Sequence, residues 1–307
     1  MTHTAAPAGG RRSTARRAVK ALSLAADRVL ARSGGITILI YHRVGSDSGS
    51  EVDLDLAVFR AQLDYLAAHA DVLPLDDAVT ALSTGALSTD HQSAGAPSPS
   101  SLSPRASSTA GSTASRRPQV VITFDDGTTD FAEHAVPALV AAGLPATLYV
   151  ATHFVDTGTA FPWGAPPASW QSLRDAASTG LVTIGSHTHS HWLLDRADHA
   201  TVTDDLDRSI DLIAQHIGTA PRHFAYPKAV LGSTATEAAV RARFASAALA
   251  RNRPNRPATT DLHRLWRTPV QRSDTAAHFA AKAAGGMRLE GTLRDLAARW
   301  TYRGQTQ

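Results

Sequence analysis

The chain has 307 residues, of which 43% are hydrophobic, enough for one large domain with a buried core. It contains no cysteine, which excludes disulfides, thiolate metal sites and a cysteine nucleophile, so a metal must bind to carboxylates or to some of the 14 histidines. The formal net charge of +3 is uneven: residues 1–34 carry seven Lys or Arg and one Asp, which leaves −3 for residues 35–307 and argues against nucleic acid as the main partner.

The first element in chain order is a basic amino-terminal arm, residues 1–34. Residues 18–32 have the periodicity of an amphipathic helix, which we expect to pack on the body of the protein, with contact between the arm and a membrane surface as the alternative. The arm lacks an apolar run of secretory length, and nothing elsewhere approaches the ~20 apolar residues of a membrane span, so we expect a cytoplasmic or membrane-peripheral location. The predicted apolar face consists of Ala21, Leu22, Ala25, Val29 and Leu30.

A low-complexity segment rich in Ser, Ala, Thr and Pro occupies residues 84–118. It has few of the large apolar residues that offset chain entropy on folding, so we expect a disordered insert. The sequence therefore predicts one domain at 35–287, interrupted by this insert, followed by a C-terminal helix and tail at 288–307.

Outside the insert, short apolar or β-branched runs alternate with helical patterns, and glycine follows several of the helices. This alternation predicts parallel βαβ units, and seven candidate strands predict a barrel, closed or incomplete, in preference to an open sheet. The predicted strands are Ile36–Tyr41, Val120–Phe124, Ala146–Ala151, Val182–Gly185, His223–Tyr226, Phe244–Leu249 and Leu265–Val270. The predicted helices include Phe59–Ala70, Asp130–Ala142, Ser169–Ser178, Val202–Ile217 and Thr234–Arg243.

Polar residues gather where the predicted strands end. In parallel α/β barrels the chemistry lies at the carboxyl-terminal ends of the strands, and a purely structural core would not need acids, histidines and an arginine together at this rim. The residues concerned are Tyr41-His42-Arg43, Asp125-Asp126, Ser186-His187, Tyr226-Pro227-Lys228 and Arg267.

Two of these segments carry patterns that suit a metal ion. Asp125-Asp126-Gly127 places adjacent carboxylates at a strand end, where they repel unless a cation or basic group holds them, although the same tripeptide is also a common turn. His187 and His191 are four residues apart, which brings two imidazoles to one face of a helical turn. If this segment is extended, His187 and His189 share a face instead.

Together these motifs resemble those of the polysaccharide deacetylase family (NodB homology domain, carbohydrate esterase family 4), over about Ile36 to Met287 outside the insert. Thr123–Gly127 is similar to the first motif of the family, in which the first Asp is the catalytic base and the second a metal ligand. His187–His191 is similar to the second motif, which supplies two metal-binding histidines. The resemblance implies a distorted, incomplete (β/α)7 barrel with Asp125 as the base and one divalent ion, expected to be Zn²⁺, bound by Asp126, His187 and His191.

The remaining site residues follow in part from the resemblance. Phe224-Ala225-Tyr226-Pro227 is similar to the third motif, which implies that the Tyr226 backbone N–H helps to stabilise the oxyanion. Tyr41-His42-Arg43-Val44 is similar to the N-terminal motif of one branch, which implies that His42 is the general acid. From position alone, Arg267 either pairs with Asp125 or forms a surface salt bridge. Two aromatic residues are candidates for sugar stacking, Trp163 and Trp192.

The implied reaction is removal of N-acetyl groups from a polysaccharide or cell-surface glycan that contains N-acetylglucosamine. Thr128, Trp192 and Lys228-Ala229 depart from residues common in the family, which affects the expected substrate more than the metal or the base. The alternatives are a polysaccharide O-acetyl esterase, a metal-dependent hydrolase of another bond such as a phosphoester, and a non-catalytic glycan-binding module.

Overall fold

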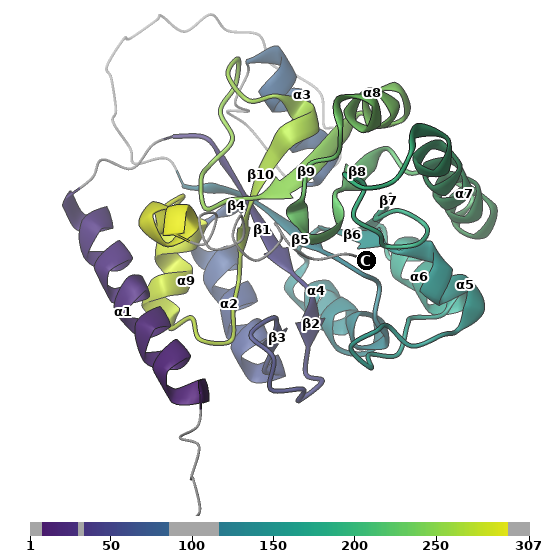
Figure 1. Cartoon of the computed structure of the whole chain (residues 1–307). Coiled ribbons are helices and arrows are strands. Elements are labelled where there is room, and N and C mark those ends of the chain that lie inside the picture. The colour runs from purple at the N-terminus through teal and green to yellow at the C-terminus, as the bar shows by residue number, and fades with distance from the viewer. Residues whose placement is uncertain (1–7, 30–33, 86–116, 294–307) are drawn as a thin grey trace, which may run out of the picture.

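The strands form a parallel barrel surrounded by helices (Figure 1). The computed structural model describes residues 8–29, 34–85 and 117–293. Strand β1 pairs with β5 on one side and with β10 on the other, which closes a ring of seven parallel strands in this part of the chain. The predicted barrel is confirmed, with one strand fewer than the eight of a TIM barrel. Its strands are β1 (Ile36–Tyr41), β5 (Gln119–Phe124), β6 (Ala146–Val150), β7 (Val182–Ser186), β8 (His223–Ala225), β9 (Ser246–Ala250) and β10 (Leu265–Pro269).

The ring is irregular. Strands β7 and β8 share a single register pair, Ser186 with Phe224, whereas β1 and β5 share six. A short strand outside the ring, β4 (Asp71–Val72), pairs with the first two residues of β5. Two further short strands, β2 (Arg43–Val44) and β3 (Asp53–Leu54), form a separate parallel pair beside the end of β1. The sequence did not predict these three, because two residues carry no periodicity.

Each predicted helix is present, and two begin earlier than predicted. Helix α2 follows the N-cap Asp55, and α7 follows the N-cap Asp198, whose side chains accept hydrogen bonds from the first-turn amides. The apolar pattern begins later than the cap because the first turn faces solvent. The helices around the barrel are α2 (Leu56–His69), α3 (Leu75–Thr84), η1 (Phe131–Ala135), α4 (Val136–Ala142), α5 (Thr152–Thr157), α6 (Trp170–Ser178), α7 (His199–Ile217), α8 (Thr234–Arg243) and α9 (Ala276–Ala283), with short 3₁₀ turns η2 (Pro227–Ala229) and η3 (Leu262–Arg264).

The largest part of the core lies between the barrel and the helices on the β1–β5–β6 side. Tyr41 and Phe124 stack with ring centroids 5.2 Å apart, and Phe59 from α2 meets both rings edge-on. The Tyr41 hydroxyl donates to Gln62 Oε1 at 3.0 Å, so the one polar atom of this aromatic cluster is satisfied. This packing fixes the end of β1, from which His42 extends.

The amino-terminal arm forms helix α1 (Ala8–Val29), which packs along the outside of α9 (Figure 1). The predicted apolar face is wrong: Ala21, Leu22 and Ala25 are exposed, Leu22 to 62%, while Val29 and Leu30 lie outside the described side chains. The buried residues of α1 include Lys20 and Ser23. The prediction from periodicity is wrong because a charged side chain of α1, Lys20, is buried against the domain in place of the apolar stripe.

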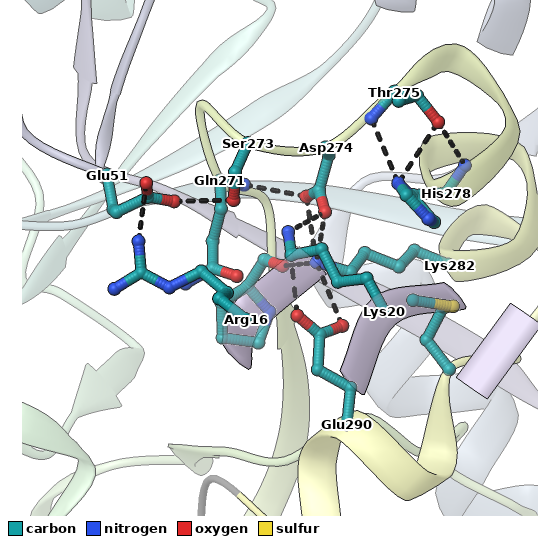
Figure 2. Close-up of polar contacts among 12 residues, drawn as sticks. Arg16, Lys20, Glu51, Gln271, Ser273, Asp274, Thr275, His278, Lys282 and Glu290 are labelled. Atoms are coloured by element: carbon teal, nitrogen blue, oxygen red, sulfur yellow. Dashed lines mark hydrogen bonds and ion pairs between the residues drawn. The ribbon is translucent and has the colours of Figure 1, made fainter. Parts of the chain in front are cut away.

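A buried cluster of two lysines and two acids joins α1 to the carboxyl-terminal part of the chain (Figure 2). The Lys20 ammonium bonds to Asp274 and lies 3.6 Å from Glu290. Lys282 lies 2.8 Å from Asp274 and 3.3 Å from Glu290. Three of these four side chains are at most 1% exposed, and the cluster is neutral overall. Each charge therefore depends on the others for compensation.

Parts of the predicted organisation lie outside the described residues. Of the predicted insert at 84–118, the structure places Thr84 and Gly85 at the end of α3 and Arg117-Pro118 before β5. The remainder, and residues 294–307 of the predicted tail, are not described. Residues 288–293 are helical, as predicted. Among the described helices, none combines the length and apolarity required to cross a membrane.

Candidate metal and catalytic site

A cleft of about 510 Å³ opens at the carboxyl-terminal ends of the strands. It contains the predicted base, the three predicted metal ligands and the predicted acid, which follow three different strands, β1, β5 and β7. Its walls are completed by residues of the loop before β3, of η2 and of the segment after β10. The lining residues are Ile40, His42, Arg43, Ser48, Ser50, Val52, Asp125, Asp126, Trp163, His187, His191, Lys228, Ala229, Ala250, Arg267, Pro269 and Gln271.

Asp126, His187 and His191 form a cluster whose geometry fits a metal ion. One oxygen of Asp126 lies 3.4 Å from His191 Nε2 and 3.7 Å from His187 Nε2, and the ligand atoms all lie within 4.8 Å of one another. Zinc bonds of about 2.1 Å in a tetrahedral site place two ligand atoms about 3.4 Å apart. The donor set, two imidazoles and one carboxylate, is one that catalytic zinc sites use.

The His187 ring is held in the orientation that a metal ligand needs. Its Nδ1 lies 2.7 Å from the Ala225 carbonyl, a contact that requires Nδ1–H to donate and leaves the Nε2 lone pair for the metal. Burial lowers the pKa of His187 to about 4, although Asp125 and Asp126 oppose this effect. The ring is therefore neutral at pH 7, as a ligand must be.

The segment from His187 to His191 is neither a helical turn nor extended. It is a bend in which Thr188 and His191 have positive φ values of 71° and 61°. The Thr188 hydroxyl accepts from the His191 amide at 2.8 Å, and the Asp205 carboxylate accepts from the amides of residues 189 and 190, each at 2.9 Å. His187 and His191 converge, whereas His189 turns away to Thr152. Asp205 is a positioning residue that the sequence did not reveal, because a single Asp in an amphipathic helix gives no signal of burial.

A sharp turn separates the two adjacent carboxylates. Asp126 and Gly127 both have positive φ, 76° and 92°, and a Cβ on Gly127 would lie 3.3 Å from Val150 Cγ1. This turn sends Asp126 toward the histidines and Asp125 toward Arg267. Burial opposes ionisation of Asp126, but the hydrogen bond from His191 and the charge of His42 outweigh it and hold the pKa of Asp126 well below its usual value.

Asp125 and Arg267 form a buried bidentate ion pair, with distances of 2.5 and 2.9 Å. Arg267 is fully buried and also donates from Nε to the Leu249 carbonyl at 3.2 Å. The surface-salt-bridge alternative for Arg267 is therefore wrong. Burial raises the pKa of Asp125, but the charge of Arg267 outweighs it and lowers that pKa, so the carboxylate is ionised at neutral pH.

His42 follows β1 directly and lines the cleft with its side chain partly buried. Its charge is among the causes that lower the pKa values of Asp125 and Asp126. The structure therefore brings together the residues to which the sequence assigned metal, base and acid roles.

The expectation for Tyr226 needs correction. Its backbone N–H donates to the Ala248 carbonyl at 3.1 Å as part of the parallel sheet, so it is not available to an oxyanion. Its ring packs edge-on against Phe224, outside the residues that line the cleft. Lys228 and Ala229 line the cleft in its place, with positive φ values of 53° and 56°.

The two tryptophans predicted to stack on a sugar differ in their position relative to the cleft. Trp163 lines the cleft, 47% exposed, with its ring centroid 5.7 Å from that of His191 and stacked on Phe161 at 4.9 Å. Trp192 is 48% exposed and is not among the residues that line the cleft, so its expected role in sugar stacking stays a prediction.

The sequence missed the polar wall of the cleft. Ser48 and Ser50 lie in the loop before β3, where the buried Asp53 carboxylate accepts from the amides and hydroxyls of Ser46 and Ser48. Gln271 follows β10, and its backbone N–H donates to the Asp274 carboxylate at 2.8 Å. These residues lie in irregular segments, in which periodicity gives no indication of which side chains reach a site.

A parallel barrel whose rim carries an Asp-His-His cluster beside an arginine-held carboxylate has the arrangement of groups that a metal-dependent hydrolase requires. Residues 112–247 match the family model described as polysaccharide deacetylase. This match supports the polysaccharide deacetylase family and the deacetylase activity that the motifs predicted.

Solved structures share the fold. The Streptococcus pyogenes deacetylase PplD, in complex with acetate, is 20% identical, with a TM-score of 0.62 over 85% of this chain and 97% of that one. IcaB from Ammonifex degensii is 23% identical, with a TM-score of 0.63 over 83% and 97%. A de-N-acetylase from Aggregatibacter actinomycetemcomitans is 16% identical, with a TM-score of 0.58 over 80% and 99%. Among curated protein sequences, none matches this chain.

Proposed function

We propose that this deacetylase is metal-dependent and removes N-acetyl groups from a polysaccharide or cell-surface glycan that contains N-acetylglucosamine. The observation that carries the proposal is the cluster of Asp126, His187 and His191 beside the Asp125–Arg267 pair in one cleft. The name of the Aggregatibacter relative specifies N-acetyl groups, and we propose the same bond here.

The residues divide the chemistry as follows. Asp126, His187 and His191 hold the metal, which we propose to be zinc and which, when bound, would polarise the acetyl carbonyl and lower the pKa of a water ligand toward ~7. Asp125, kept ionised and oriented by Arg267, takes the proton of the attacking water. His42 gives a proton to the departing amine, so that the C–N bond breaks to leave a free amino sugar and acetate.

The walls of the cleft support a sugar substrate. Trp163 lines the cleft and is 47% exposed, and an exposed indole suits the apolar face of a pyranose ring. The lining also includes Ser48, Ser50 and Gln271, whose hydroxyls and side-chain amide can bond to sugar hydroxyls and to the acetamide.

The assay that tests the proposal measures amine and acetate release from N-acetylglucosamine oligomers. We expect both products in equal amounts, loss of both after chelation, and recovery on addition of Zn²⁺. His191→Ala should lose most of its bound metal, measured by elemental analysis, together with its activity. Full metal occupancy in this variant would refute the ligand assignment.

His189→Ala provides the matched control, because it removes an imidazole from the same bend without removing a member of the cluster. It should keep its metal. Acetate release from O-acetylated glycans without amine release from N-acetyl glycans would identify an O-acetyl esterase instead. Binding of the oligomers with no product from either substrate would identify a non-catalytic module.

Replacing His42 with Ala tests the proposed acid. An amine leaves only with a proton, whereas an activated aryl oxide leaves without one, so His42→Ala should impair hydrolysis of the N-acetyl oligomer about 10²-fold or more while sparing an aryl acetate. Metal content should be unchanged. Equal losses on both substrates would assign His42 a structural role, and no loss on either would remove it from the mechanism.

A further inference from the structure

A second cavity, of about 440 Å³, lies away from the catalytic cleft. Most of its lining comes from the segment that connects β9 to β10. This segment is anchored at the amino-terminal end of the barrel, because Ile36, the first residue of β1, exchanges backbone hydrogen bonds of 2.7 and 2.8 Å with Asn255. The cleft lies at the other ends of the same strands. The lining residues are Arg253, Pro254, Arg256, Thr259, Thr260, Asp261, Arg264, Trp266 and Arg288.

The charge of this cavity contrasts with the rest of the protein. Residues 35–307 carry a net charge of −3, yet the lining contains four arginines and a single acid. That acid, Asp261, is ion-paired with Arg241, and the neighbouring Glu237 is held by Arg264 at 2.7 and 2.8 Å. Both local carboxylates are therefore compensated by their own arginines, and the cavity as a whole keeps an excess of positive charge.

Two hydrogen bonds hold Arg256 in place at the wall of the cavity. The Arg256 amide donates to the Thr260 hydroxyl at 2.7 Å, and its Nε donates to the Gly34 carbonyl at 3.3 Å. The Arg256 side chain also lines the cavity. Arg288, from the helical stretch after α9, forms another wall. Arginines from two separate segments therefore line the same cavity.

We propose that this cavity binds the phosphate group of an anionic ligand. Planar guanidinium forks match the geometry of phosphate oxygens, and the hydroxyls of Thr259 and Thr260 can add further donors. The volume exceeds that of a single phosphate and falls in the range of small-ligand sites, so a group attached to the phosphate also has room. The partly buried Trp266 ring lines the cavity and can pack against that group. This site is distinct from the deacetylation centre and does not depend on the proposed function.

Binding of inorganic phosphate and of a soluble phosphodiester polymer, measured by titration calorimetry at low salt, tests the proposal. The double variant Arg256→Gln/Arg288→Gln should weaken binding about tenfold or more, because each lost charge-assisted bond removes a substantial share of the affinity. Arg60→Gln/Arg208→Gln, two exposed arginines outside the cavity, removes the same net charge and should leave binding unchanged. Both titrations are run on metal-free enzyme, so that phosphate cannot bind at the catalytic metal.

The outcomes separate the sources of the phosphate. Tighter binding of the polymer than of inorganic phosphate would indicate a polymer with phosphodiester links, and equal binding would indicate a small phosphorylated ligand. The proposal is overturned if wild-type enzyme binds neither probe, or if the two double variants weaken binding equally, since that would be a non-specific effect of net charge. The wild type and both double variants should deacetylate small oligomers at equal rates. The binding test therefore gives its answer whether or not the proposed function holds.

Discussion

Asp125→Asn should lose turnover and stability together. As the proposed base, Asp125 is expected to contribute about 10²–10⁴-fold to kcat. Its carboxylate is also the only acid that the structure pairs with the fully buried Arg267 among the described residues, at 2.5 and 2.9 Å. Removing one member of a buried pair leaves the other charge uncompensated, so we expect the free energy of unfolding to fall by about 3–5 kcal/mol. Denaturant unfolding and initial rates measure the two effects.

A double variant separates the two roles. Asp125→Asn/Arg267→Met removes both charges and should recover much of the lost stability, but none of the activity. An active Asp125→Asn enzyme would show that another group takes the proton. A single variant as stable as the wild type would show that Arg267 does not depend on Asp125.

The pH dependence of stability follows from the same pair. The pKa of Asp125 is lower in the folded protein than the ~3.9 of an unfolded Asp, so its contribution to stability is complete above pH ~4 and is lost as the pH falls through the folded pKa. The difference in unfolding free energy between wild type and Asp125→Asn should therefore be largest near pH 7 and decrease below pH ~4.

Lys20→Met should also destabilise the protein by about 3–5 kcal/mol, although Lys20 lies in the arm and far from the barrel in sequence. Its ammonium is 1% exposed and compensates Asp274 and Glu290 together with Lys282 (Figure 2). Without it, two buried acids share one lysine. We propose from this cluster that α1 is an integral part of the folded domain, and thermal or denaturant unfolding of the full chain measures the loss.

Two further variants test whether charge is the cause. Lys20→Met/Glu290→Gln restores neutrality to the cluster and should be more stable than the sum of the two single variants predicts. Leu22→Ala, on the exposed face of the same helix, should change stability by less than about 0.5 kcal/mol. If Leu22→Ala loses much stability and Lys20→Met loses none, α1 packs through its apolar face and not through the charged cluster.

The chemistry of the site was readable from the sequence because it is carried by residue types in short segments. Asp125-Asp126-Gly127 and His187–His191 each follow a strand that was predicted within one or two residues. Parallel strands that end at one rim must bring those segments together, so the metal cluster could be predicted without coordinates. The side chain of Trp192, in contrast, depends on a bend with two positive φ values that no pattern indicated.

The sequence by itself determined the strand and helix order and the barrel class, since local periodicity encodes them. The resemblance of its motifs to a known family implied Asp126, His187 and His191 as the metal ligands. Only the tertiary structure decided which face of α1 is buried, that Asp205 holds the histidine bend, that the Tyr226 amide belongs to the sheet, and that Arg267 is fully enclosed. Those features depend on partners far away in the chain, such as Lys20 with Asp274 and Asp125 with Arg267. Burial and pairing of a charge are properties of its surroundings in space, which the spacing of residues along one segment does not contain.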